Sequence, residues 1–224
     1  MVCNAGDDDS KTRQSALESL CENYWYPLYS FARRKVQQRE QAEDLIQSFF
    51  ATLLEKNIVA SADSGRGRFR AFLITSLKNH MANEWHKQNA AKRGGSRKLL
   101  SLDFDQGDSK YAIEPSTTLT PEQLFDRSWA ITLLNRVLER LESDQETFGK
   151  GDQFRALKPY LLGNAPSSYA DVAAELNLSE GAAKMAVSRL RKNYRDTLRA
   201  EIAHTVNDED EIEDEIRDLF RAMA

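Results

Sequence analysis

Apolar side chains recur every three or four residues along most of the chain, which is the spacing of one face of an α-helix. The pattern predicts helices over about 11–36, 40–54, 69–87, 120–141 and 153–162. No stretch of useful length alternates apolar and polar residues as a half-buried strand would. We therefore predict an all-α fold.

The second and third of these helices have the best-defined apolar faces. The second carries Ala42, Leu45, Ile46, Phe49, Phe50, Leu53 and Leu54 at steps of three and four. The third carries Phe69, Phe72, Leu73, Leu77, Met81 and Trp85. An apolar stripe of this width normally faces a core, so we expect both sets to be buried.

The helical periodicity is lost between about 90 and 119, where glycine, proline, serine and threonine accumulate as they do in linkers. It resumes at Thr120, which can cap a helix whose capping box Gln123 would complete. We therefore predict two small helical domains joined by a flexible linker. The boundaries we expect are 1–92 for the first domain, 93–119 for the linker, 120–206 for the second domain and 207–224 for an acidic tail.

The segment 167–194 predicts two helices joined by a short turn. Ser168 and Asp171 can form the capping box of the first helix, and Ser179 can cap the second. Between them Asn177 can adopt the left-handed backbone conformation that the turn needs. We expect the second domain to contain a helix-turn-helix with these residues facing inward: Val172, Ala173, Leu176, Leu178, Ala183, Val187 and Leu190.

The outward face of the second of these helices has the composition of a recognition helix. Its residues are Glu180, Lys184, Ser188, Arg189, Arg191 and Lys192. Long cationic side chains can donate to phosphates and guanine edges in the major groove, and a carboxylate can accept from cytosine. An ordinary helical hairpin with a solvated basic face remains an alternative at this point.

The formal net charge of -4 conceals two basic zones. Residues 65–98 hold nine basic residues against one acidic residue, and residues 184–199 hold six against one. Eight acidic residues are concentrated in 208–218. Such clustering of positive charge favours a nucleic-acid partner even in a chain that is acidic as a whole.

The basic zone around the third helix mixes cations with amides and aromatic rings. Asn79 and Asn83 lie one helical turn apart, and His80, Trp85 and His86 are interleaved with them. This combination suits unstacked bases, which stack on rings and bond to amides. The alternative is that most of the rings belong to the core and that the charges form a solvated face.

Other functional classes find little support in the sequence. The chain has only Cys3 and Cys21, without histidines at ligand spacing, so we expect neither disulfides nor a metal site. His80, His86 and His204 have no catalytic constellation around them, and no phosphate-binding glycine loop is present. We expect a non-enzymatic protein without cofactor. The absence of a signal peptide or a long apolar run favours a cytoplasmic location without a membrane partner.

Two motifs, QAEDLIQSFF at 41–50 and the segment 69–83, occur together with the helix-turn-helix at 168–191. In this combination the chain resembles the bacterial RNA polymerase sigma factors of the extracytoplasmic-function group over about 15–203. The resemblance implies core RNA polymerase and promoter DNA as partners, with an anti-sigma factor as a further candidate. It also implies a cytoplasmic protein that joins the nucleoid when bound to polymerase.

The resemblance assigns roles to particular residues. It implies docking to the clamp of the largest polymerase subunit by Glu43, Asp44, Gln47 and Phe50. It implies opening and capture of the promoter −10 element by the segment that carries Arg66, Arg68, Arg70, Asn79, Asn83 and Lys87. The helix-turn-helix, with the outward residues given above, would read the −35 element.

Three features depart from the family pattern. Ala182, Ala183 and Ala186 replace residue types common in the family's recognition helix, so base preference does not transfer. The segment 141–167 is longer than usual, and the acidic tail is an addition. The tail has an apolar stripe at helical spacing, formed by Ile212, Ile216, Leu219 and Phe220. We expect a helix that either docks on a basic surface of this protein, restraining DNA binding, or only adds solubility.

Two other classes stay open on the sequence alone. A conventional helix-turn-helix regulator that acts as a dimer would share the C-terminal features, but it would not need Asp44, Gln47, Asn79 and Asn83 together. An adaptor that binds only protein would leave both basic zones unexplained.

Overall fold

The computed structural model describes residues 10–36, 38–55, 68–90, 102–113, 118–206 and 208–224. Every regular element in these ranges is an α-helix, which confirms the predicted all-α fold. None of the described helices has the length and apolar composition that a membrane crossing requires. The chain divides into two compact units, which are described separately below.

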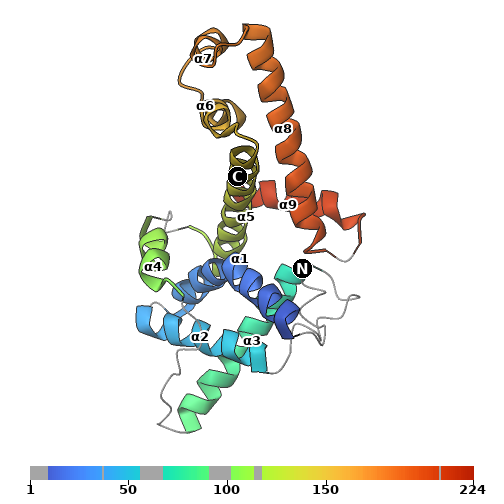
Figure 1. The fold of residues 1–224 in the computed structure, drawn as a ribbon. Coiled ribbons are helices and arrows are strands. Elements are labelled where there is room, and N and C mark those ends of the chain that lie inside the picture. Colours follow the sequence, from blue (N-terminus) through green and yellow to red (C-terminus); the bar gives the residue numbers. More distant parts are fainter. Residues whose placement is uncertain (1–9, 37, 56–67, 91–101, 114–117, 207) are drawn as a thin grey trace. The chain divides into compact units, whose positions relative to one another are not determined.

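The first unit comprises residues 1–132 together with 202–224. Its helices are α1 (Ser10–Val36), α2 (Arg39–Glu55), α3 (Phe69–Ala90), α4 (Phe104–Ile113), the start of α5 (Pro121–Thr147) and α9 (Glu211–Met223). Helix α1 packs against α2 and α4, and α2 packs against α3 (Figure 1). Its core includes Leu28, Phe31, Ile46, Phe49, Leu73 and Leu77, all buried. The predicted stripe of α2 is therefore confirmed at its described positions, apart from the half-buried Leu45.

The second unit comprises residues 133–201. It contains the rest of α5, α6 (Gly151–Leu162), α7 (Tyr169–Glu175) and most of α8 (Glu180–Ala203) (Figure 1). Its buried side chains include Val137, Phe154, Leu157, Val172, Val187 and Leu190. Val172, Val187 and Leu190 were predicted to face inward, and with the other buried side chains they give the unit a core of its own.

Several helix ends follow the capping chemistry that the sequence predicts. The Gln123 amide N–H donates to Thr120 Oγ1 at 3.2 Å, and the Thr120 amide donates back to Gln123 Oε1 at 2.9 Å. Ser168 and Asp171 form a second capping box. Asn177 has a φ of 54°, the left-handed conformation expected in the turn. Local sequence therefore determines where these helices start and stop.

The structure differs from the sequence prediction at the expected linker, since helix α4 lies within 93–119. Phe104 is buried on it, and a Cβ added at Gly107 would come within 2.8 Å of the Trp25 ring. Arg33 on α1 forms an ion pair with Asp108 on α4 at 2.8 Å. Only Phe104 and Gly107 of α4 are buried, which is too few for the sequence to show a helical period. Tertiary contacts, rather than local sequence, therefore determine that this helix forms.

The two units also divide the chain at other points than the domain boundaries expected from the sequence. The start of α5, up to residue 132, belongs with the first unit, as does the predicted tail. The tail forms α9, whose Ile212 and Leu219 are buried. The expected apolar stripe is thus only partly buried, since Ile216 is half-buried and Phe220 is exposed.

Candidate nucleic-acid interface

The predicted docking residues lie on α2 but do not share one environment. Asp44 is exposed, and Glu43 is partly exposed and forms an ion pair with Arg39 at 2.6 Å. Arg39 also pairs with Asp105. A partner protein can reach Asp44 and Glu43 without any rearrangement of the first unit.

Gln47 and Phe50, the other two predicted docking residues, are both buried. Phe50 is only 1% exposed, and its ring packs 5.9 Å from that of Phe49. Gln47 is 8% exposed, and its Oε1 atom has no hydrogen-bond partner among the described residues. The burial of Phe50 could be predicted from the sequence, since Phe50 belongs to the apolar stripe of α2. Both side chains therefore lie on the buried face of α2 and do not form its outer surface.

Arg68 and Arg70, predicted to contact the −10 element, are held by carboxylates of the same unit. Arg70 donates to Glu215 through Nε (2.6 Å to Oε1) and Nη2 (3.1 Å to Oε2), and it also pairs with Asp126. Arg68 pairs with Glu215 at 3.0 Å and with Asp218. Docking of the acidic tail on a basic surface was one of two alternatives that the sequence left open, and these partners could not be identified from the sequence.

The environment of this cluster shifts three ionisation equilibria. Burial opposes the charge on Arg70, but the hydrogen bond and charge of Glu215 raise its pKa above the ordinary value. Burial likewise opposes ionisation of Asp218, yet the hydrogen bond from Arg68 and the nearby arginine charges lower its pKa. Burial raises the pKa of Asp126, which the charge of Arg70 offsets only in part. The cluster is thus a set of mutually dependent charges.

The C-terminal half of α3 presents a more accessible surface. Asn79 and Asn83 are exposed, as the sequence predicts. Trp85 is 64% exposed, which contradicts its expected place on the buried stripe, and its ring lies 5.5 Å from that of His86. Amides and an open indole on one helix end can bond and stack with unpaired bases. Trp85 was expected on the buried stripe because the apolar periodicity of α3 continues beyond the part of the helix that packs against the core.

His80 lies at the edge of this surface and contacts α2. Its Nε2 atom is 2.8 Å from Ser48 Oγ, and its ring lies 5.7 Å from Phe49. These contacts give His80 a packing role between the two helices. Of the other residues predicted for this segment, Arg66 lies outside the described residues, as does the side chain of Lys87.

In the second unit, α7 and α8 are joined by residues 176–179, and the outward residues of α8 are placed as predicted. Glu180, Lys184, Ser188, Arg189, Arg191 and Lys192 are all exposed. Lys184 pairs with Glu180 at 2.6 Å, and this hydrogen bond raises the pKa of Lys184. Arg191 donates to the backbone carbonyl of Tyr160 at 2.9 Å, which ties α8 to α6. The Nε of Arg189 donates to the backbone carbonyl of Met185 on the same helix at 3.5 Å.

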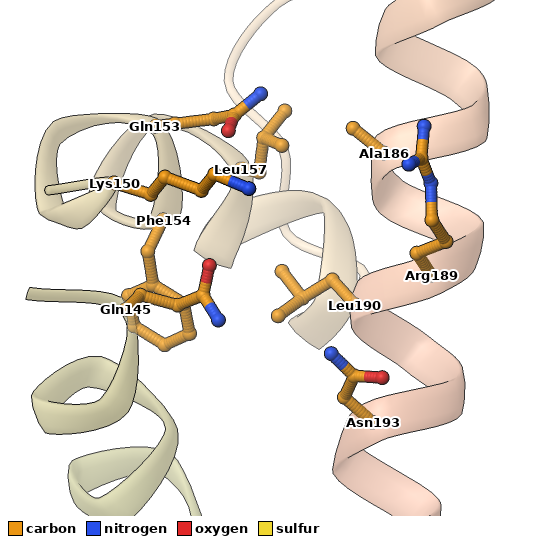
Figure 2. A pocket seen from close by; sticks show the side chains of 9 residues that line it. All are labelled: Gln145, Lys150, Gln153, Phe154, Leu157, Ala186, Arg189, Leu190 and Asn193. Atoms are coloured by element: carbon orange, nitrogen blue, oxygen red, sulfur yellow. The ribbon is translucent and has the colours of Figure 1, made fainter. Parts of the chain in front are cut away.

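A cavity of about 290 Å³ lies beside Arg189 within the second unit (Figure 2). Lys150 and Arg189 contribute positive charge to its wall, and Gln145, Gln153 and Asn193 contribute amides. No acidic residue is among those that line it. The wall of this cavity is therefore suited to an anionic group.

No group of three or more histidine, cysteine or carboxylate side chains with metal-site geometry occurs in the described parts of the chain. The arrangement as described consists of an acidic exposed edge on α2, an exposed amide and indole surface on α3, and a cationic face on α8. Such surfaces bind partners through charge, stacking and hydrogen bonds.

The first part of the chain matches a known protein family. Residues 21–91 match the Sigma-70 region 2 family, so the match spans α2, α3 and most of α1. No curated protein and no solved structure gives a significant match to the chain. The match supports a sigma factor, a class of protein that binds RNA polymerase and recognises the promoter −10 element.

Proposed function

We propose that this chain, with its sigma-70 region 2 domain, is a sigma factor of the extracytoplasmic-function group that directs core RNA polymerase to particular promoters. The observation that carries the proposal is the match of residues 21–91 to region 2. The protein acts by binding and carries out no catalysis of its own. It works in the cytoplasm, at the nucleoid when polymerase is bound.

In this proposal the exposed edge of α2 is the polymerase-docking surface. Asp44 and Glu43 supply the charge that meets the clamp of the largest polymerase subunit. The burial of Phe49 and Phe50 beneath them supports a rigid docking helix, because a packed apolar face fixes the helix against α1 and α3. Docking then depends on the outer carboxylates and only indirectly on the buried residues.

The exposed end of α3 would capture the −10 element as a single strand. Asn79 and Asn83 are available for hydrogen bonds to base edges, and the Trp85 ring is available for stacking. Stacking on an aromatic side chain contributes about 1–3 kcal/mol per base. Since unstacking costs about a few kcal/mol per step, two or three such contacts are enough to offset local opening of the duplex.

The second unit would bind the −35 element as a helix-turn-helix. This assignment is supported by the capped start of α7, the left-handed Asn177 in the turn and the exposed cationic face of α8. Lys184, Arg189 and Lys192 are exposed on that face and can extend into a major groove, whereas Arg191 is engaged with the backbone of Tyr160. An anti-sigma factor remains a candidate partner from the sequence resemblance only.

The experiment that tests the function is co-elution of the full chain with core RNA polymerase, followed by transcription from a promoter library without any other sigma factor. We expect binding and selective initiation. Asp44→Arg should abolish co-elution, while Asp196→Arg, the same charge change on exposed α8, should leave it intact.

Two results would contradict the proposal. One is failure of the wild-type chain to bind core polymerase while it binds duplex DNA as a dimer, which would favour a conventional regulator. The other is unchanged polymerase binding by Asp44→Arg, which would remove α2 as the docking surface.

A further inference from the structure

Helix α9 carries a carboxylate at a position where an apolar residue would be expected. Glu215 lies between Ile212 and Leu219 on the buried face of the helix, and its own side chain is 1% exposed. A buried carboxylate is costly unless it is paired and hydrogen-bonded. The position of Glu215 therefore points to a specific cationic partner.

That partner is the arginine pair at the start of α3, Arg68 and Arg70. Glu215 accepts from Arg70 at 2.6 and 3.1 Å and from Arg68 at 3.0 Å. Asp218, one turn further along α9, pairs with Arg68 and approaches Arg70 at 3.4 Å. Two guanidinium groups thus meet two carboxylates of α9 in the arrangement that Arg uses for phosphate groups.

The docked helix cancels the positive charge of this surface. With Asp126 also paired to Arg70, three carboxylates surround two arginines. Arg70 is only 12% exposed, and its guanidinium lies 4.8 Å from the centre of the Trp129 ring. Neither its charge nor its donors are available to a second anion while α9 is in place.

The chain leading into α9 is attached to the same end of α3. The amide N–H of Phe69 donates to the carbonyl of Thr205 at 3.1 Å. This bond satisfies an amide in the first turn of α3, a group that a helix leaves free for an external acceptor. Both the side chains and the backbone at this helix start are therefore occupied by the C-terminal segment.

We propose that α9 occupies the Arg68–Arg70 surface as an intramolecular substitute for DNA phosphates, and that promoter DNA displaces it when the protein engages the −10 region. The inference rests on the proposed function, in which α3 binds promoter DNA, and adds a regulation of that same site. Free protein then has low affinity for DNA at this surface. Displacement of α9 exposes two arginines for phosphate contacts.

The test compares two full-length double variants that remove equal charge from the C-terminal segment. Glu215→Gln/Asp218→Asn neutralises the carboxylates that face the arginines. Asp210→Asn/Asp214→Asn is the matched control, since Asp210 makes no side-chain cap bond and Asp214 pairs with Arg217 on α9 itself. The probe is a mixed-sequence single-stranded DNA oligonucleotide, with binding followed by fluorescence anisotropy over a range of salt concentrations.

We expect the Glu215→Gln/Asp218→Asn protein to bind the oligonucleotide at least about tenfold more tightly than the control. Its affinity should also depend more steeply on salt, because two additional phosphate contacts change the logarithmic slope by about 1.4. Equal affinities and equal slopes for the two variants would overturn the inference.

A second measurement uses the wild-type chain, so it does not depend on how the variants fold. Amide hydrogen exchange in 211–223 should accelerate when the oligonucleotide saturates the protein, because α9 leaves its binding site. Unchanged protection of α9 at saturation would overturn the inference.

Polymerase binding by the wild-type chain distinguishes a failure of this inference from a failure of the proposed function. If the wild-type chain co-elutes with core polymerase but α9 responds in neither measurement, only the regulatory inference fails. If the chain does not bind polymerase at all, the proposed function fails, whatever α9 does.

Discussion

Arg70 and Glu215, separated by 145 positions in the sequence, form a two-bond pair with Nε–Oε1 and Nη2–Oε2 distances of 2.6 and 3.1 Å. The pair joins the first turn of α3 to the middle of α9, so the C-terminal helix belongs to the same compact unit as the sigma-70 region 2 match. Because Glu215 is buried, the pair matters for stability as well as for charge.

Removing the arginine of this pair should destabilise the first unit strongly. Arg70→Ala leaves Glu215 buried with only Arg68 as a partner, and we expect a loss of about 3 kcal/mol in the free energy of unfolding. Arg155→Ala, which removes exposed ion pairs with Glu146 and Asp152 in the second unit, should cost far less. Urea titrations followed by tryptophan fluorescence and circular dichroism measure both. Similar small losses for the two variants would show that the buried pair is not important for stability.

The exposed indole of Trp85 should contribute to binding of single-stranded DNA but not to folding. Trp85→Ala should weaken binding of an oligonucleotide by about 1–3 kcal/mol per stacked base and leave thermal stability nearly unchanged. Trp129→Ala is the contrasting variant, because Trp129 is buried and its truncation should cost about 3–5 kcal/mol of stability. An unaltered oligonucleotide affinity in Trp85→Ala would remove this residue from the −10 surface.

Two arginines on α8 should behave differently in duplex binding. Arg189→Ala should weaken binding to the preferred promoter, with a loss of about 1–3 kcal/mol and relaxed specificity at one position if Arg189 reads a base. Arg191→Ala breaks the bond to the Tyr160 carbonyl and should lower the stability of the second unit. Binding assays and thermal melts of both variants distinguish the roles. If Arg189→Ala lowered the melting temperature but left duplex binding unchanged, Arg189 would not belong to the recognition surface.

The buried amide of Gln47 predicts an unusual outcome for a residue of the polymerase-docking motif. Gln47→Met keeps the side-chain volume and removes a buried oxygen that has no hydrogen-bond partner among the described residues. We expect unchanged or slightly raised stability, by up to about 1 kcal/mol, together with normal polymerase co-elution. Loss of co-elution in a fully folded Gln47→Met protein would show that this side chain reaches the polymerase after all.

The capping box at the start of α7 should make the second unit sensitive to acid. The hydrogen bonds from the Ser168 side chain and backbone lower the pKa of Asp171 below its ordinary value. A carboxyl with a lowered pKa in the folded state stabilises the fold above its unfolded pKa, and this contribution disappears as the pH falls through the folded pKa. The protection factors of α7 amides, which compare their exchange rates with those of unfolded peptide at the same pH, should therefore fall below the ordinary pKa range of aspartate. Asp171→Asn should flatten that response. An equal acid response in the variant would assign it to other groups.

Local sequence by itself determined the all-α class, the major helices and their caps. The boxes at Thr120–Gln123 and Ser168–Asp171 and the left-handed Asn177 follow from bonds between near neighbours, which is why they could be predicted. The outward face of α8 was predicted for the same reason. A helix of regular period fixes which side chains share a face.

Tertiary structure alone decided the features that depend on distant partners. Helix α4 forms inside an expected linker because Phe104 and Gly107 pack on α1. The apolar period of α3 continues to Trp85, although none of the described residues covers its ring. Gln47 and Phe50 match a docking motif, yet their burial becomes visible only when α2 is packed. The pairing of Arg70 with Glu215 could not be read from the chain, because a charge pattern shows which groups attract but not which of them the fold brings together.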